Sequence, residues 1–262
     1  GVALCAVPEL ASAQAPLLGG LGGPAGYGTG VLEYNDDGSS AEISITNAFP
    51  NGLEFIGQRN NSIYVNNNGS ITFGAAVGTY TPSRFPIQGQ RMIAPWWGDV
   101  DTRGAGRPQR NGVYWDIRPG QLTVTWHNVG YYSSNNSREN SFQLVIRGGE
   151  GWDEDHVWQV EFRYNRCEWT TGNASGGSGG LGGTPAQAGF DAGNGQSFQI
   201  LPGSGTAQIL DLCTTSNVEE AGVWQYIVEM GAPQPAPVGE GHVETTDYSR
   251  GAPPPRRRRR RP

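Results

Sequence analysis

The chain has 262 residues and a formal net charge of −6, and only 16% of its residues are charged. This length allows one large β domain or two small ones, and the low charge means that Asn, Gln, Ser, Thr and Gly supply most of the polar surface. Six positive charges lie in the run Arg256 to Arg261, so the rest of the chain is more acidic than the whole and is a poor candidate for binding nucleic acid.

The first segment, residues 1–15, has the features of the end of a secretory signal. Its sequence GVALCAVPELASAQA contains a short apolar stretch, a proline and an A-x-A cleavage pattern at Ala13 to Ala15. No later apolar run approaches the ~20 residues that a membrane helix needs. We therefore expect an exported, extracellular product without a membrane span. The basic residues are all arginine, and together with the A-x-A pattern this composition predicts a bacterial source.

Residues 16–30, PLLGGLGGPAGYGTG, are rich in glycine and are expected to form a flexible lead-in. From Val31 the pattern changes to short runs that alternate apolar and polar residues. SIYVNNNGSITF predicts a hairpin, because Asn68-Gly69 can supply a tight turn between two such runs. GVYWDIRPGQLTVTWHNV predicts another, with its turn at Pro119-Gly120.

Three further runs show the same alternation. NSFQLVIR, VWQVEFRY and GVWQYIVE each place apolar residues on one face, and in the second run Gln159, Glu161 and Arg163 are expected to point outward. No window of about 12 residues has a helical period. Half-buried strands joined by hairpins pair into stacked antiparallel sheets. We therefore predict an all-β fold, an antiparallel β-sandwich over residues 31–230 with long Gly/Asn-rich loops.

Two stretches are predicted to be irregular. Residues 172–183, GNASGGSGGLGG, are expected to form a flexible loop, and residues 231–262 a disordered Pro/Gly-rich tail. The arginine run at the end of this tail is more consistent with a solvated segment than with a site for anionic polymers or lipids.

Removal of Cys5 with the signal leaves Cys167 and Cys213. Two cysteines in an exported domain most simply form one disulfide, although two free thiols remain an alternative. The bond would close a loop of roughly 45 residues and contribute on the order of 4 kcal/mol in the chain-entropy model.

The stretch MIAPWWGDVDTR, residues 92–103, is the main candidate for a site. Trp96 and Trp97 are adjacent on an extended segment, so they should face opposite sides, one in the core and the other against a second surface or a ligand. Asp99 and Asp101 alternate, so their carboxylates should project to the same side. Such a pair can bind calcium, but the EF-hand pattern fails at Arg103, where an oxygen ligand belongs.

The alternatives to a calcium site are a structural and a catalytic one. Asp99 and Asp101 can instead accept backbone N–H groups and fix a loop, which the sequence favours over calcium. A glycosidase needs two carboxylates across a cleft, and no second wall is identifiable. The three histidines lack zinc-ligand spacing, so no catalytic residue is assigned. The ligand-binding residues and the oligomeric state are not predictable from these patterns.

In their order along the chain, ten segments resemble the nidogen-like extracellular domain that also occurs in tectorin-like and mucin-like proteins. The resemblance runs from about Leu53 to Val228. The segments are IYVNNNGSITFG, YTPSRFP, IAPWWGDVDTR, GVYWDI, LTVTWHNVGYY, NSFQLVI, VEFRYNRCEWTTG, AGFDAG, FQILPGSGT and TSN followed by GVWQYIV.

The resemblance implies an extracellular module of the cell–matrix adhesion type with no enzyme activity and no obligate cofactor. Its partners would be a protein or glycan of the extracellular matrix or cell surface. No catalytic motif can be carried over, and with so few cysteines we expect no EGF-like module. The alternative is a carbohydrate-binding or glycoside-hydrolase β-sandwich, which would need exposed aromatic residues and facing carboxylates in a groove.

Overall fold

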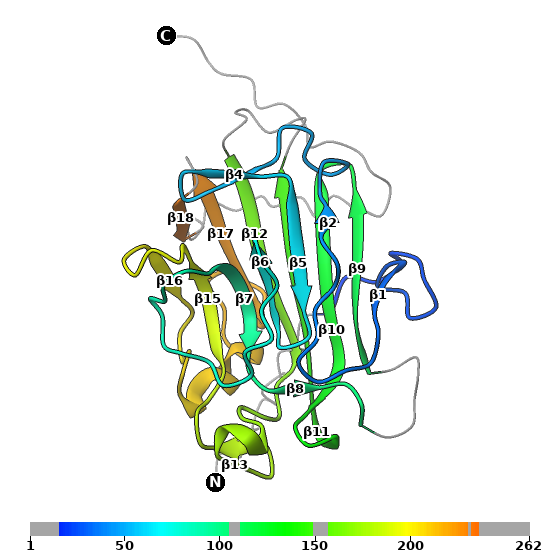
Figure 1. Ribbon diagram of the computed structural model, residues 1–262, viewed down its shortest axis with the longest axis vertical. Coiled ribbons are helices and arrows are strands. Elements are labelled where there is room, and N and C mark those ends of the chain that lie inside the picture. Colours follow the sequence, from blue (N-terminus) through cyan, green and yellow to red (C-terminus); the bar gives the residue numbers. More distant parts are fainter. Residues whose placement is uncertain (1–15, 105–110, 149–156, 230–231, 236–262) are drawn as a thin grey trace, which may run out of the picture.

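Two antiparallel β-sheets lie face to face in the protein (Figure 1). The computed structural model describes residues 16–104, 111–148, 157–229 and 232–235. The remaining residues include the predicted signal remnant and most of the predicted tail, which therefore lie outside the described part of the chain. The predicted all-β sandwich is confirmed.

The larger sheet of the described chain has the strand order β1-β9-β10-β11-β12-β17-β18, with β8 paired to β10. The bounds of these strands are β1 Gly30–Leu32, β8 Val100–Asp101, β9 Gly112–Arg118, β10 Gln121–Tyr131, β11 Asn135–Gly148, β12 Val157–Arg166, β17 Val223–Glu229 and β18 Ala232–Pro235.

The smaller sheet has the order β16-β15-β7-β6-β5-β2. Its strands are β2 Ile43–Ser44, β5 Ser62–Asn66, β6 Ser70–Phe73, β7 Arg91–Trp97, β15 Gln187–Asp191 and β16 Phe198–Ile200. Two short hairpins lie outside both sheets, and two 3₁₀ helices complete the fold. These elements are β3 Leu53–Phe55, β4 Gln58–Asn60, β13 Gly177–Ser178, β14 Leu181–Gly182, η1 Asn173–Ser175 and η2 Ala207–Cys213.

Both predicted hairpins form, and each has a glycine in the left-handed backbone region at its turn. Gly69 has φ of 79° between β5 and β6, and Gly120 has φ of 75° between β9 and β10. A residue with a side chain is strained there. At Gly69 the restriction is also steric, because an added Cβ would lie 1.8 Å from the carbonyl oxygen of Trp96. The β5–β6 turn is thus pressed directly against β7.

Aromatic side chains fill the space between the sheets. Trp96 of β7 stacks on Phe142 of β11, with ring centroids 6.0 Å apart, and Trp126 of β10 stacks on the same ring at 5.2 Å. Phe162 of β12 meets Phe190 of β15 edge to face. These side chains are fully buried. Alternation along each strand places one apolar face in the core, as the sequence patterns predicted.

The outer face of the larger sheet differs from the prediction. Gln159, Glu161 and Arg163 do face away from the core, but Glu161 and Arg163 are only 3% and 7% exposed. The segment that begins at residue 16 contacts Arg163, and Glu161 is engaged by Arg147, Arg163 and Gln225. The Arg163 guanidinium donates to the Pro16 carbonyl at 3.0 Å, and Gln143 exchanges hydrogen bonds with the backbone of Leu18. This segment, expected to be flexible, packs on the sheet.

Two other stretches that were expected to be irregular have defined structure. Within residues 172–183, η1 and the β13–β14 hairpin form a compact loop, and the Gly180 carbonyl accepts from the backbone of Thr170. At the predicted start of the tail, Ala232–Pro235 form β18, which pairs with β17. The prediction of disorder from residue 231 is therefore wrong for these four residues. Proline is tolerated there because β18 is an edge strand.

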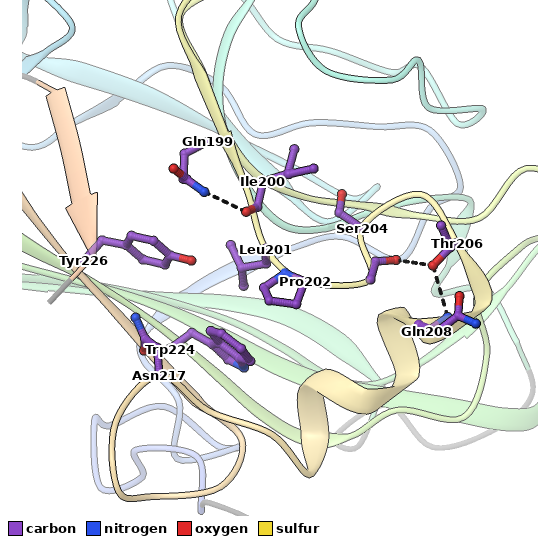
Figure 2. A pocket seen from close by; sticks show the side chains of 11 residues that line it. Gln199, Ile200, Leu201, Pro202, Ser204, Thr206, Gln208, Asn217, Trp224 and Tyr226 are labelled. Atoms are coloured by element: carbon purple, nitrogen blue, oxygen red, sulfur yellow. Dashed lines mark hydrogen bonds between the residues drawn. The ribbon is translucent and has the colours of Figure 1, made fainter. Parts of the chain in front are cut away.

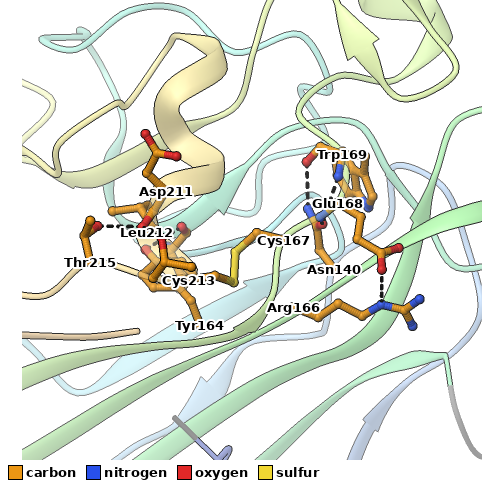
Figure 3. Close-up of a disulfide and its surroundings, with 12 residues drawn as sticks. Asn140, Tyr164, Arg166, Cys167, Glu168, Trp169, Asp211, Leu212, Cys213 and Thr215 are labelled. Atoms are coloured by element: carbon orange, nitrogen blue, oxygen red, sulfur yellow. Dashed lines mark hydrogen bonds and ion pairs between the residues drawn. A yellow bond between two sulfur atoms is a disulfide. The ribbon is translucent and has the colours of Figure 1, made fainter. Parts of the chain in front are cut away.

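A disulfide joins Cys167, just after β12, to Cys213 at the end of η2 (Figure 3). The predicted pairing is confirmed. The bond spans 46 residues of sequence and anchors η2 to the end of the larger sheet. Because η2 follows the segment after β16, the bond also fixes one wall of the groove described below.

Candidate functional site

Trp96 and Trp97 face opposite sides of β7, as predicted. Trp96 lies in the main core, whereas Trp97 packs in a second cluster with Phe85, Met92 and Ala94. The Trp97 indole N–H donates to the Thr79 carbonyl at 2.8 Å. Trp97 is only 3% exposed, so it covers a second surface and does not present its ring to a ligand.

Asp101, on β8, fixes a loop. Its Oδ1 accepts from the backbone N–H and the Nε of Arg103, at 2.9 and 3.0 Å. Its Oδ2 accepts from Arg103 Nη2 and from the backbone N–H of Ser134, each at 2.7 Å. Burial alone would raise the pKa of Asp101, but these bonds hold the pKa below its usual value. Both carboxylate oxygens are thus engaged.

Asp99, two residues earlier, has a different environment. Its side chain is 1% exposed, and Oδ2 has no hydrogen-bond partner among the described residues. Burial, followed by the charges of Asp36 and Asp37, raises the pKa of Asp99 to about 7. Gly172 approaches so closely that an added Cβ would lie 2.2 Å from Oδ2. Asp99 accepts one backbone hydrogen bond, from Ala174, which opposes the rise in its pKa. It thus contacts a different loop from Asp101 and keeps one oxygen without a partner among the described residues.

The partners of Asp99 come from the segment after β1. One oxygen from each of Asp36, Asp37 and Asp99 lies within 4.8 Å of the others. Burial, followed by the charges of Asp101 and Asp37, raises the pKa of Asp36 to about 6, although Arg103 opposes this rise. Asp36 Oδ2 pairs with Arg103 at 2.8 Å, while its Oδ1 is buried without a hydrogen-bond partner in the described structure.

Asparagines of the β5–β6 turn hold this aspartate cluster together. The Asn68 amide donates to Asp37 Oδ1 at 2.9 Å and accepts from the backbone N–H of Val100 at 3.0 Å. The Asn67 amide donates to the carbonyls of Val100 and Asp36. The turn thus connects the segment after β1 to the start of β8.

The predicted pair of Asp99 and Asp101 therefore divides into two roles. Asp101 belongs with Arg103 and Ser134, and Asp99 belongs with Asp36 and Asp37. The sequence pattern missed Asp36 and Asp37 because they are more than 60 positions away. Their only signal was an acidic doublet before a glycine.

A second candidate is an open groove of about 590 Å³ between β16, η2 and β17 (Figure 2). Trp224 and Tyr226 of β17 approach Leu201 and Pro202 of the segment after β16, and Ile200 lies on the rim with 42% of its surface exposed. The polar lining comes from amides and hydroxyls. The lining residues are Gln199, Ile200, Leu201, Pro202, Gly203, Ser204, Thr206, Gln208, Asn217, Trp224 and Tyr226.

The sequence profile of the nidogen-like domain matches residues 61–116 and 118–230. The chain belongs to the nidogen-like domain family. Alpha-tectorin of Mus musculus is 36% identical over 219 residues, which cover 74% of this chain and 10% of that protein. Nidogen of Drosophila melanogaster is 27% identical over 199 residues, which cover 67% of this chain and 14% of that protein. No solved structure matches the chain significantly.

The nidogen-like domain thus spans only about a tenth of the length of the curated relatives that it matches first. These relatives are animal proteins, so the bacterial source expected from composition is not borne out. Among the described residues, none of the helices has the length and apolar character that crossing a bilayer requires. Asp99 and the residues that line the groove lie within the matched residues, whereas Asp36 and Asp37 precede them.

Proposed function

We propose that this nidogen-like domain is an extracellular, non-enzymatic interaction module that binds a protein of the extracellular matrix or cell surface. Family membership supports the module type, since the matched relatives include nidogen and alpha-tectorin. The observation that carries the proposal is the groove between β16, η2 and β17.

The chemistry of the groove favours binding over catalysis. None of its lining residues is charged, so it offers no carboxylate pair for general acid–base hydrolysis. Trp224 and Tyr226 form the buried floor of the groove, and the side chains that offer apolar surface to a partner are Ile200 and the nearby Phe198, which expose 42% and 41% of their surfaces. Aromatic and aliphatic anchors with a polar, uncharged rim are typical of protein-binding surfaces.

The edge strand adjoining the groove favours an extended protein segment as the partner. Within the described part of the chain, β16 pairs only with β15 and ends the smaller sheet. An unpaired strand edge can hydrogen-bond to an added strand, while neighbouring pockets select its side chains. The alternative occupant is a glycan, which amide side chains and aromatic rings also recognise.

A cell-attachment assay tests the proposal. Surfaces are coated with the full chain, with Ile200→Arg or with Val31→Arg, a control of similar exposure on β1 at the far edge of the other sheet. Placing an unpaired charge on an apolar contact should reduce binding about tenfold or more, because its burial costs ~2 kcal/mol or more. Val31→Arg should bind like the unmodified protein.

Two parallel measurements separate the alternatives. Binding to a glycan array that Ile200→Arg abolishes would replace the protein partner with a carbohydrate. Turnover of chromogenic glycosides would refute a non-enzymatic module. Equal attachment to both variants and the unmodified protein would exclude the groove as the binding surface.

A further inference from the structure

We propose that Asp36, Asp37 and Asp99 form a calcium-binding site that clamps the segment after β1 onto the β5–β6 turn and β8. This inference concerns residues that do not line the groove and goes beyond the proposed binding function. It does not depend on which partner the groove takes.

The geometry of the three carboxylates fits one shared cation. Calcium is bound by oxygen ligands at about 2.3–2.6 Å, so two ligands of one ion lie at most about 5 Å apart. One oxygen from each of the three aspartates lies within 4.8 Å of the others. The three ligands come from two separate segments, 36–37 and 99, so a shared ion would join parts of the chain that are distant in sequence.

The oxygens without partners provide an independent reason. Asp99 Oδ2 and Asp36 Oδ1 are both buried, and neither has a hydrogen-bond partner among the described residues. A buried polar atom without a partner is costly, and a charged one is more so. The opposite oxygen of Asp36 already contacts Arg103, so the free oxygen is the one available to a ligand. A cation held by the three carboxylates would supply a partner to an aspartate that lacks one.

The local charge has the sign that a divalent cation requires. Asp36, Asp37, Asp99 and Asp101 lie together, and the cation that faces them in the described structure is Arg103. Arg103 is committed to Asp101 through a bidentate contact and reaches only one oxygen of Asp36. The remaining aspartate carboxylates repel one another unless they take up a proton or a metal ion.

The three carboxylate ligands favour calcium over other divalent metal ions. All three ligands are carboxylates, which are hard oxygen donors, and Asp37 is exposed, so water can complete the coordination shell. Magnesium requires near-ideal octahedral geometry at about 2.0–2.1 Å, which three carboxylates on two segments supply less readily. Partly exposed sites of this kind in extracellular modules have dissociation constants of about 10⁻⁴–10⁻³ M.

The competing explanation is a protonated Asp99 without a metal ion. Burial in an acidic neighbourhood raises the pKa of this carboxyl to about 7, so a proton could neutralise it instead. The two explanations differ in their response to calcium. A protonated acid gives no calcium-dependent stabilisation, whereas a calcium site gains free energy with ion concentration through linkage.

Thermal melts of the full chain at pH 7.5 separate them. At calcium 100 times the dissociation constant, the melting temperature should exceed that in chelator by about 5–10 °C. Magnesium chloride and sodium chloride of equal ionic strength control for screening and should produce a much smaller rise. Terbium luminescence, sensitised by nearby aromatic residues, gives the affinity directly and should be competed by calcium.

Three variants localise the site. Asp99→Asn and Asp37→Asn should each weaken calcium binding about tenfold or more, because affinity follows ligand charge. Asp37 is exposed, so its variant keeps the test valid even if Asp99→Asn folds poorly. Asp211→Asn removes the same charge from an exposed position on η2 and should bind calcium normally.

Some results would overturn the proposal. Identical melts in calcium and chelator would leave a protonated Asp99 as the explanation. An equal response to magnesium would remove the assignment to calcium. A calcium response that survives in both Asp99→Asn and Asp37→Asn would place the ion at other residues.

Discussion

Replacement of Asp101 by alanine should destabilise the domain strongly, and the hydrogen bonds around this side chain set the magnitude. The Asp101 carboxylate is fully buried and accepts from the backbone N–H groups of Arg103 and Ser134 at 2.9 and 2.7 Å. A hydrogen bond to a charged group contributes about 1.5–3 kcal/mol, so loss of these two should lower the free energy of unfolding by about 3–6 kcal/mol. The ion pair with Arg103 adds little, because 44% of that side chain is exposed.

Differential scanning calorimetry of the unmodified protein, Asp101→Ala and Arg103→Gln checks this estimate. With about 2–4 °C per kcal/mol for a domain of this size, Asp101→Ala should melt at least about 6 °C lower. Arg103→Gln keeps the backbone donors and should lose about 1 kcal/mol or less. If Asp101→Ala melted like the unmodified protein, or lost a calcium response that Asp99→Asn retained, the division of roles between the two aspartates would be wrong.

Three other predictions concern stability. Reduction of Cys167–Cys213 should lower the melting temperature by about 8–16 °C, because a loop of 46 residues corresponds to about 4 kcal/mol; an unchanged melt with two titratable thiols would contradict this. Burial raises the pKa of Glu161, but two arginines hold it below its usual 4.5, so its contribution is present above that pH and is lost as the pH falls through the folded value. Denaturant titrations from pH 6 to pH 3 should show this loss, with a flatter profile for Glu161→Gln. Gly69→Ala should lose more than the 1–2 kcal/mol typical of left-handed backbone strain, because its methyl group meets the Trp96 carbonyl; an equal denaturation midpoint would refute the close approach.

Local features of this fold were predictable from sequence. The turns at Gly69 and Gly120 depend on backbone conformations that short sequences specify. The opposite orientations of Trp96 and Trp97 follow from the two-residue period of a strand. Turn conformation and side-chain alternation are local properties that do not depend on which strands pair.

Contacts between distant segments were not predictable in this way. Alternation correctly placed Arg163 on the outer face, but its contact with the Pro16 carbonyl joins it to a segment almost 150 positions earlier. The aspartate cluster has the same origin, because the Asn67 and Asn68 amides bring Asp36 and Asp37 to β8. The sequence pattern therefore pointed to Asp99 and Asp101 but could not place Asp36 and Asp37 beside Asp99.

The groove was also invisible to sequence patterns. Trp224 and Tyr226 lie on the buried face of a strand that alternates regularly, so they were interpreted as core residues. They are indeed mostly buried, and the groove beside them is formed together with the segment after β16 and with η2, whose placement the strand pattern does not reveal. The exposure of Ile200 next to them depends on β16 being the last strand of its sheet, which is a property of topology.

The most direct test of the account is an anomalous difference map from crystals of the full chain grown with calcium, compared with crystals grown in chelator. We expect a peak bounded by carboxylate oxygens of Asp36, Asp37 and Asp99 at about 2.3–2.6 Å, with Asp101 still bound to Arg103. A map without a peak there, or an ion that is held by Asp101 in place of Asp99, would contradict the account.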